Sequence, residues 1–182
     1  PGGLAYVNVL ASMLFGSISG SAVAATAAIG GFMSPLMKKE GYDREFSASV
    51  NISSSVTGLL IPPSNIMVVF SLASGGVSIA ALFIAGYLPG LLLGLALMVV
   101  AGLIAKRRNY PVGERVGLGQ SLRVFADAVP SLFLLVVVMG GIIRGWFTPT
   151  EASAIAVLYT FVLSVIIYRE IKWSELPRLL TD

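Results

Sequence analysis

Two short polar segments interrupt a strongly apolar sequence, and they hold the residues whose types and spacing could bind ions. The first segment is Gly16–Ser21, and the second runs from Ser53 to Asn65. Hydroxyl, amide and free backbone carbonyl oxygens suit Na⁺, whereas exposed N–H groups at helix starts suit a carboxylate. We therefore predict one site that holds both Na⁺ and an organic anion. Its candidate residues are Ser17, Ser19, Gly20, Ser21, Ser53, Ser54, Ser55, Gly58, Pro62, Pro63, Ser64 and Asn65.

Residue types that are missing narrow the chemistry of this site. Neither segment contains the Asp or Glu that usually holds Ca²⁺ or Mg²⁺. Ser19-Gly20 in a membrane would also fit an intramembrane serine protease, which needs a general base. The chain has no histidine and no cysteine, and every lysine lies in a charged loop or tail. We expect no enzyme activity, no cofactor and no transition metal. An alternative for each serine is that its hydroxyl bonds back to its own helix.

The composition is that of an integral membrane protein. The chain is 56% hydrophobic and 12% charged, with a mean hydropathy of +0.89, whereas soluble proteins average roughly 25% charged residues. Charges are absent from residues 1–37 and 46–105, and these gaps mark the lipid-embedded parts. The net charge of +3 reflects membrane orientation, so we expect no nucleic-acid partner. The fold class predicted from these observations is an all-α, polytopic membrane protein.

The first apolar region reads as a re-entrant helical hairpin over residues 4–37. Its arms, Leu4–Phe15 and Ala22–Met37, flank the first polar segment. At about 1.5 Å per residue they reach roughly 18 and 24 Å, less than the ~30 Å hydrocarbon core. One continuous helix remains an alternative, because small residues also pack membrane helices closely. Neither arm can span the membrane alone.

Residues 46–74 read as one crossing made of two half-helices. Pro62 and Pro63 remove two amide donors, and Gly58 loosens the chain. Backbone that unwinds inside a membrane must line a cavity or be buried in protein, because unpaired polar groups there cost several kcal/mol. The alternative is an ordinary proline-kinked helix. The break is the feature most indicative of function.

Three further crossings follow, over residues 77–105, 121–144 and 151–168. Pro89 should kink the first of them, and Trp146-Phe147 fits an interfacial anchor. Thr150 fits an N-cap, with Glu151 in the first helical turn. Thr148, Thr150 and Glu151 are further candidate ligands. We predict three parts: a transport half over 1–75, a long scaffold or connecting helix with a loop over 76–123, and the start of a second repeat over 124–182.

The basic residues predict the orientation in the membrane. With the predicted crossings, eleven of the twelve Lys and Arg residues fall on one side, and only Arg144 falls on the other. The positive-inside rule makes the rich side cytoplasmic. Its members are Lys38, Lys39, Arg44, Lys106, Arg107, Arg108, Arg115, Arg123, Arg169, Lys172 and Arg178. The hairpin should then open to the cytoplasm, although a spanning first helix would give the same count.

An ordered set of motifs resembles the large membrane subunit of tripartite ATP-independent periplasmic (TRAP) transporters. The motifs are Gly16–Ala24, Lys38–Phe46, Ile61–Ser64, Leu82–Gly86 with Pro89-Gly90, and Phe147–Ala152. The sequence departs from the family pattern at Ala25, where Asp is common, and at Asn65, where Ile is more usual. The first departure removes a charge near the hairpin tip, so no ion binding is assigned to position 25. The second adds an amide beside the predicted site.

The resemblance implies a Na⁺-driven secondary transporter in the cytoplasmic (inner) membrane of a bacterium or archaeon. It implies an extracytoplasmic solute-binding protein that delivers an organic acid, and a small four-helix membrane subunit as partner. An elevator-like movement and an inverted second repeat are also implied. Because no initiator Met or signal peptide opens the chain, we expect an internal fragment.

Two other function classes remain open at this point. A dicarboxylate or citrate symporter without a binding protein would use the same broken helices. A membrane scaffold that does not transport would use the polar segments only for packing.

Overall fold

The computed structural model describes residues 2–112 and 117–168, all of whose regular elements are helices. The chain divides into two compact units, Pro1–Glu114 and Arg115–Asp182. Three described helices are long and apolar enough to cross a membrane, and a bent helix pair can make a fourth crossing. The all-α, polytopic class is therefore confirmed. The predicted cytoplasmic segment after residue 168 lies outside the described residues.

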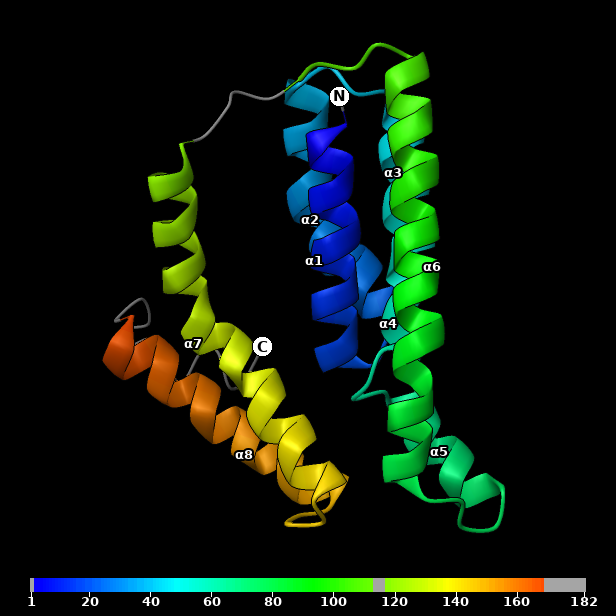
Figure 1. The fold of residues 1–182 in the computed structure, drawn as a ribbon, viewed down its shortest axis with the longest axis vertical. Coiled ribbons are helices and arrows are strands. Elements are labelled where there is room, and N and C mark those ends of the chain that lie inside the picture. Colours follow the sequence, from blue (N-terminus) through cyan, green and yellow to red (C-terminus); the bar gives the residue numbers. More distant parts are fainter. Residues whose placement is uncertain (1, 113–116, 169–182) are drawn as a thin grey trace. The chain divides into compact units, whose positions relative to one another are not determined.

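The first unit begins with a helical hairpin. Helices α1 (Gly3–Ser19) and α2 (Ala22–Lys39) lie side by side and run in opposite directions (Figure 1). A single continuous helix is therefore excluded. The predicted polar interruption was too wide, because Gly16–Ser19 complete α1 and only Gly20-Ser21 leave the helical path. Gly20 takes the left-handed conformation with φ of 62°, which reverses the chain.

The broken helix follows as three pieces, α3 (Arg44–Ser55), α4 (Thr57–Leu60) and α5 (Asn65–Ala73). The stretches before and after the break differ in direction by 47°. The predicted break was again too wide, since most of Ser53–Leu60 stays helical. Serine and threonine hydroxyls can bond to carbonyls one turn back without ending a helix. Pro62 and Pro63 lack an N–H, so the helix stops before them.

Close backbone approach packs the broken helix against the hairpin. A Cβ atom added to Gly58 would lie 2.3 Å from the Cα of Gly16, and one added to Gly16 would lie 2.6 Å from the Cα of Gly58. Only glycine at both positions lets α1 and α4 come this close. Small residues have this role at helix interfaces in membranes.

Helix α6 (Ile79–Arg107) lies beside α4 and α5 (Figure 1). It covers the break with glycines four residues apart. A Cβ on Gly86 would lie 2.4 Å from the carbonyl oxygen of Leu60, and one on Gly90 would lie 2.5 Å from the Ile61 side chain. Helix α6 therefore packs in the same unit as the hairpin and the broken helix. The predicted functional division at residues 75 and 123 stays a prediction, but the compact units do not follow it.

An aromatic and ionic cluster joins α6 to the start of α3. The Tyr42 and Tyr110 rings stack with centroids 4.5 Å apart, and Phe46 lies 5.1 Å from Tyr110. The Asp43 carboxylate accepts hydrogen bonds from the Tyr110 hydroxyl and from Arg108. These two bonds, the tyrosine first, hold the pKa of Asp43 below its ordinary value. Arg108 also donates to the Tyr110 hydroxyl at 3.4 Å, and this bond, together with the one to Asp43, raises the pKa of Arg108.

The second unit contains α7 (Leu118–Ile143), α8 (Pro149–Phe161) and a π-helical turn η1 (Val162–Ile167) that continues α8. Tyrosine hydroxyls hold the two helices together near Pro130. Tyr159 donates to the Pro130 carbonyl at 2.7 Å, and Tyr168 donates to the Asp127 carbonyl at 2.7 Å. The predicted crossings at 121–144 and 151–168 correspond to these helices.

We expect Gly58→Ala to destabilise the full-length protein. The new methyl group would overlap the backbone of Gly16, and such overpacking costs typically about 1–3 kcal/mol. A lower melting temperature in detergent would show this. Gly31→Ala is the matched control, since a Cβ there meets nothing within 4 Å. Equal melting temperatures for the two variants would contradict the close contact.

We expect Asp43→Asn to lower the melting temperature at pH 7. A carboxyl with a depressed folded-state pKa stabilises the protein above its unfolded-state pKa of about 3.9. That contribution is lost as pH falls through the folded-state pKa, so the wild type and Asp43→Asn should converge in acid. Glu40→Gln is the control, because no ion pair of Glu40 occurs among the described residues. A difference that stays constant from pH 7 to pH 3 would contradict the assignment.

Candidate functional site

The hairpin tip is held by its own hydrogen bonds. The Gly20 N–H donates to the Gly16 carbonyl at 2.7 Å and closes α1. The Ser21 hydroxyl accepts from the Ala24 N–H at 3.2 Å and caps the start of α2. The Ser19 hydroxyl donates to the Ser21 carbonyl at 3.3 Å. The tip is therefore a defined turn whose serine oxygens lie beside a helix start.

The second polar segment meets this tip at Asn65. The Asn65 Nδ2 donates to the Ser19 carbonyl at 3.2 Å, across 46 residues of sequence. A Cβ on Gly20 would lie 2.7 Å from the backbone nitrogen of Asn65 and 2.9 Å from the Cγ of the Asn65 side chain. The structure thus brings Ser19, Gly20 and Asn65 into direct contact, as expected if the two segments share one site.

Several predicted ligands are instead buried and bonded to nearby backbone. Ser17, Ser54, Ser55 and Ser64 are at most 2% exposed. The Ser17 hydroxyl donates to the Leu14 carbonyl and the Ser64 hydroxyl to the Leu59 carbonyl, both at 2.7 Å. The Ser54 and Ser55 hydroxyls both donate to the Asn51 carbonyl, at 3.1 and 2.7 Å. Bonding to nearby backbone is the alternative that the sequence analysis left open for each serine. Each oxygen keeps lone pairs, so the bonds do not remove its ability to ligate a cation.

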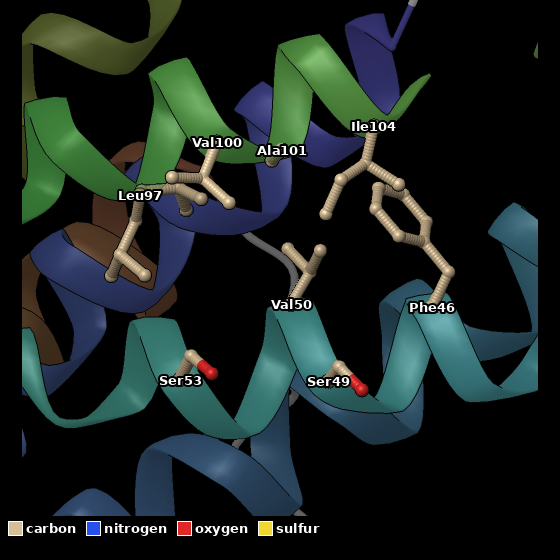
Figure 2. Close-up of a pocket in the computed structure, with 9 residues that line it drawn as sticks. Phe46, Ser49, Val50, Ser53, Leu97, Val100, Ala101 and Ile104 are labelled. Atoms are coloured by element: carbon tan, nitrogen blue, oxygen red, sulfur yellow. The ribbon is translucent and has the colours of Figure 1, made fainter. Parts of the chain in front are cut away.

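Ser53 lies apart from the tip. It is exposed on α3 and, with Ser49, borders a pocket of about 100 Å³ between α3 and α6 (Figure 2). Most of the pocket is lined by apolar side chains, with Val50 directed toward α6. The structure therefore does not bring Ser53 together with Gly20 and Asn65.

The prolines and Gly58 act through the backbone. Pro62 is fully buried, Pro63 is half-buried, and Gly58 supports the contact with α1. None of the three has a side chain that can ligate an ion. They set where α4 ends and α5 begins, and hence where Asn65 lies.

Two helix starts converge at the tip. Helix α2 begins at Ala22, directly after it, and the backbone nitrogen of Asn65, the first residue of α5, lies against Gly20. The N-cap residue of α5, Ser64, makes no capping hydrogen bond with its side chain, and its hydroxyl donates to the Leu59 carbonyl. Backbone N–H groups at helix starts carry partial positive charge and attract anions.

The donor set fits Na⁺ better than a transition metal. Within residues 2–112 and 117–168, no group of three or more His, Cys, Asp or Glu side chains could hold a metal ion. The tip and the break offer hydroxyl, amide and carbonyl oxygens without formal charge. Such oxygens are hard ligands of the kind that coordinate Na⁺ in broken-helix transporters.

Asn51 is a buried polar residue that the sequence analysis did not single out. Its Nδ2 donates to the Thr26 carbonyl at 2.9 Å, and its side chain occupies the space left by Gly30. Its Oδ1 is the one buried side-chain polar atom without a hydrogen-bond partner in the described part of the chain. An asparagine within an apolar crossing was the available signal. The Asn51 side chain joins α2 of the hairpin to α3 of the broken helix.

The Thr148–Glu151 motif forms a capping box. The Glu151 carboxylate accepts from the Thr148 N–H at 2.7 Å, and the Thr148 hydroxyl accepts from the Glu151 N–H at 3.4 Å. The predicted cap at Thr150 was wrong by two residues, because Pro149 fits the first helical position and moves the cap to Thr148. The hydroxyl and carboxylate thus have a structural role at the start of α8.

These features define the class of protein. A helical hairpin, a broken helix that meets its tip, and apolar crossings describe a polytopic membrane protein. The family described as "Tripartite ATP-independent periplasmic transporter, DctM component" matches residues 1–182. The chain belongs to this family, and the resemblance read from its motifs is confirmed.

Curated relatives agree with this assignment. The chain is 60% identical over 182 residues to "Uncharacterized protein YgiK" of Salmonella typhimurium, covering 100% of this chain and 42% of the relative. It is 43% identical over 181 residues to the C4-dicarboxylate TRAP transporter large permease protein DctM of Pseudomonas aeruginosa, with coverage of 100% and 42%.

A third relative carries a different substrate in its name. The 2,3-diketo-L-gulonate TRAP transporter large permease protein YiaN of Escherichia coli is 39% identical over 176 residues, covering 97% of this chain and 41% of the relative. The chain therefore spans about two fifths of the length of these relatives. These relatives include permease subunits of transporters, and no catalytic family is indicated.

We expect Thr148→Ala to lower the stability of the full-length protein by about 1 kcal/mol, the usual cost of losing an N-cap. Thr148→Ser should retain most of the stability, because serine keeps the capping oxygen. Thermal unfolding in detergent measures both. A loss of transport in Thr148→Ala with an unchanged melting temperature would instead assign Thr148 to ligand binding.

Proposed function

We propose that the full-length protein is the large permease subunit of a Na⁺-coupled, binding-protein-dependent transporter that imports an organic acid. The observation that carries this proposal is the contact between the hairpin tip and the broken helix at Gly20 and Asn65. It joins two polar segments inside an apolar fold. Unwound polar backbone within an apolar crossing is typical of a substrate path.

The anion half of the proposal rests on the helix starts. The N-termini of α2 and α5 meet at the tip, and neither break contains a basic side chain. Backbone N–H groups and helix dipoles therefore attract the carboxylate. The names of relatives include C4-dicarboxylate and 2,3-diketo-L-gulonate, which are consistent with an organic acid as substrate.

The cation half rests on neutral oxygens at the same place. Ser19 and Ser21 at the tip, together with hydroxyls and carbonyls of the broken helix, would hold Na⁺ without a carboxylate. When bound, Na⁺ supplies positive charge beside the transported anion. The chain's own contribution is to hold the turn at the hairpin tip against the start of α5.

Family membership supports two protein partners. We propose a small four-helix membrane subunit and an extracytoplasmic solute-binding protein, in the cytoplasmic membrane of a bacterium or archaeon. The Lys- and Arg-rich loops would face the cytoplasm, so the hairpin would enter from that side. Transport would follow an elevator-like movement, and the glycine face of α6 would carry that helix along with the hairpin and the broken helix.

Gly20→Ala tests the proposal in the full-length permease with its partner subunits. A side chain at Gly20 meets Asn65 and also strains a left-handed backbone, which costs roughly 1–2 kcal/mol. We expect uptake into proteoliposomes under an inward Na⁺ gradient to fall at least about tenfold. Gly31→Ala is the control and should transport like the wild type.

Two outcomes would contradict the proposal. Wild-type uptake by Gly20→Ala would show that the tip is not part of the site. Uptake that proceeds equally under a K⁺ gradient, with no Na⁺ on either side, would show that Na⁺ is not the coupling ion.

A further inference from the structure

Asn65 has a second side-chain group that its structural bond leaves unused. Its Nδ2 is committed to the Ser19 carbonyl at 3.2 Å. The residue is exposed, and within the described ranges its Oδ1 has no hydrogen-bond partner. One bond therefore fixes the amide against the hairpin tip and leaves its oxygen free beside the tip.

A free amide oxygen discriminates between ligand groups. It accepts a hydrogen bond and cannot donate one, so it pairs with a hydroxyl and not with a carboxylate oxygen. The start of α5, where Asn65 itself is the first residue, favours a carboxylate through its N–H groups. The two features side by side suit a ligand that carries a carboxylate and a hydroxyl close together.

The serines near the tip are less accessible acceptors than the Asn65 oxygen. Ser64 turns its hydroxyl to the Leu59 carbonyl, Ser17 turns its hydroxyl to Leu14, and Ser21 already accepts from the Ala24 N–H. Ser17 and Ser64 are also at most 2% exposed, and Ser19 and Ser21 are only partly exposed, whereas Asn65 is exposed. The Asn65 oxygen is thus the side-chain acceptor that the tip presents most openly.

We propose that Asn65 is a specificity-determining residue that selects a hydroxylated organic acid over the same acid without hydroxyl groups. This inference rests on the proposed function, since it assigns the substrate class of the same site. An unhydroxylated dicarboxylate would leave the amide oxygen without a donor, whereas a hydroxy acid or sugar acid would satisfy it.

The test compares matched acids on the purified full-length permease with its small subunit, in Na⁺ buffer. The probes are succinate against tartrate, and adipate against galactarate, so each pair differs only in hydroxyl groups. Apparent dissociation constants follow from the rise in melting temperature with acid concentration. We expect the wild type to bind the hydroxylated member of at least one pair about 3- to 10-fold more tightly, the effect of one net hydrogen bond.

Two variants remove the acceptor in different ways. Asn65→Ala deletes the amide, and Asn65→Ile replaces it with an apolar side chain of similar size. Either variant should bring the ratio of dissociation constants to about one, and the loss of the bond to the Ser19 carbonyl weakens the binding of both acids of a pair by the same factor. Ser49→Ala, on α3 beside the apolar pocket, is the matched control and should keep the wild-type ratio.

The outcomes separate the inference from the proposed function. If the wild type binds acids but shows no preference, or if both Asn65 variants keep the preference, the role of Asn65 is wrong and the transport proposal stands. If no acid of either pair binds in the presence of Na⁺, the proposed function fails for these substrates and the inference fails with it.

Discussion

The backbone contact between Gly16 and Gly58 is the interaction on which the rest of the first unit depends. It brings α1 against α4 closer than any side chain would permit. The hairpin tip lies one turn beyond Gly16, and the end of α4 lies just after Gly58. Because the two helices approach here, the tip and the start of α5 meet as well, and the Asn65 amide reaches Ser19.

A second constraint comes from the break itself. Two prolines end α4 within an apolar crossing, where backbone groups without partners are costly. The protein meets this cost by covering the break, with Gly86 of α6 against the Leu60 carbonyl and Gly90 against Ile61. The buried hydroxyls have a related role, since Ser54 and Ser55 bond to the Asn51 carbonyl within their own helix. Many of the polar groups near the proposed site therefore stabilise the fold, and fewer of them are available to ligands.

The distinction between stabilising and ligand-binding groups is one of geometry. Ser17 and Ser19 are two residues apart in one helix, yet Ser17 is buried against Leu14, while Ser19 lies at the tip and its carbonyl receives the Asn65 amide. Likewise Ser53 and Ser54 are neighbours that face opposite surroundings, an apolar pocket and the buried interior. Residue type alone does not separate these cases, because one residue along a helix turns a side chain by about 100°.

The sequence by itself determined the class of the protein, the existence of two interruptions and the family, because charge-free apolar stretches, prolines and ordered motifs are local properties. It overestimated the width of both interruptions, since a serine within a helix and a serine in a turn look alike until the hydrogen bonds are known. Only the tertiary structure decided that Gly58 meets Gly16, that Asn65 meets Gly20 and that Asn51 joins α2 to α3. These contacts join residues 25 to 45 positions apart, and their geometry depends on how whole helices pack.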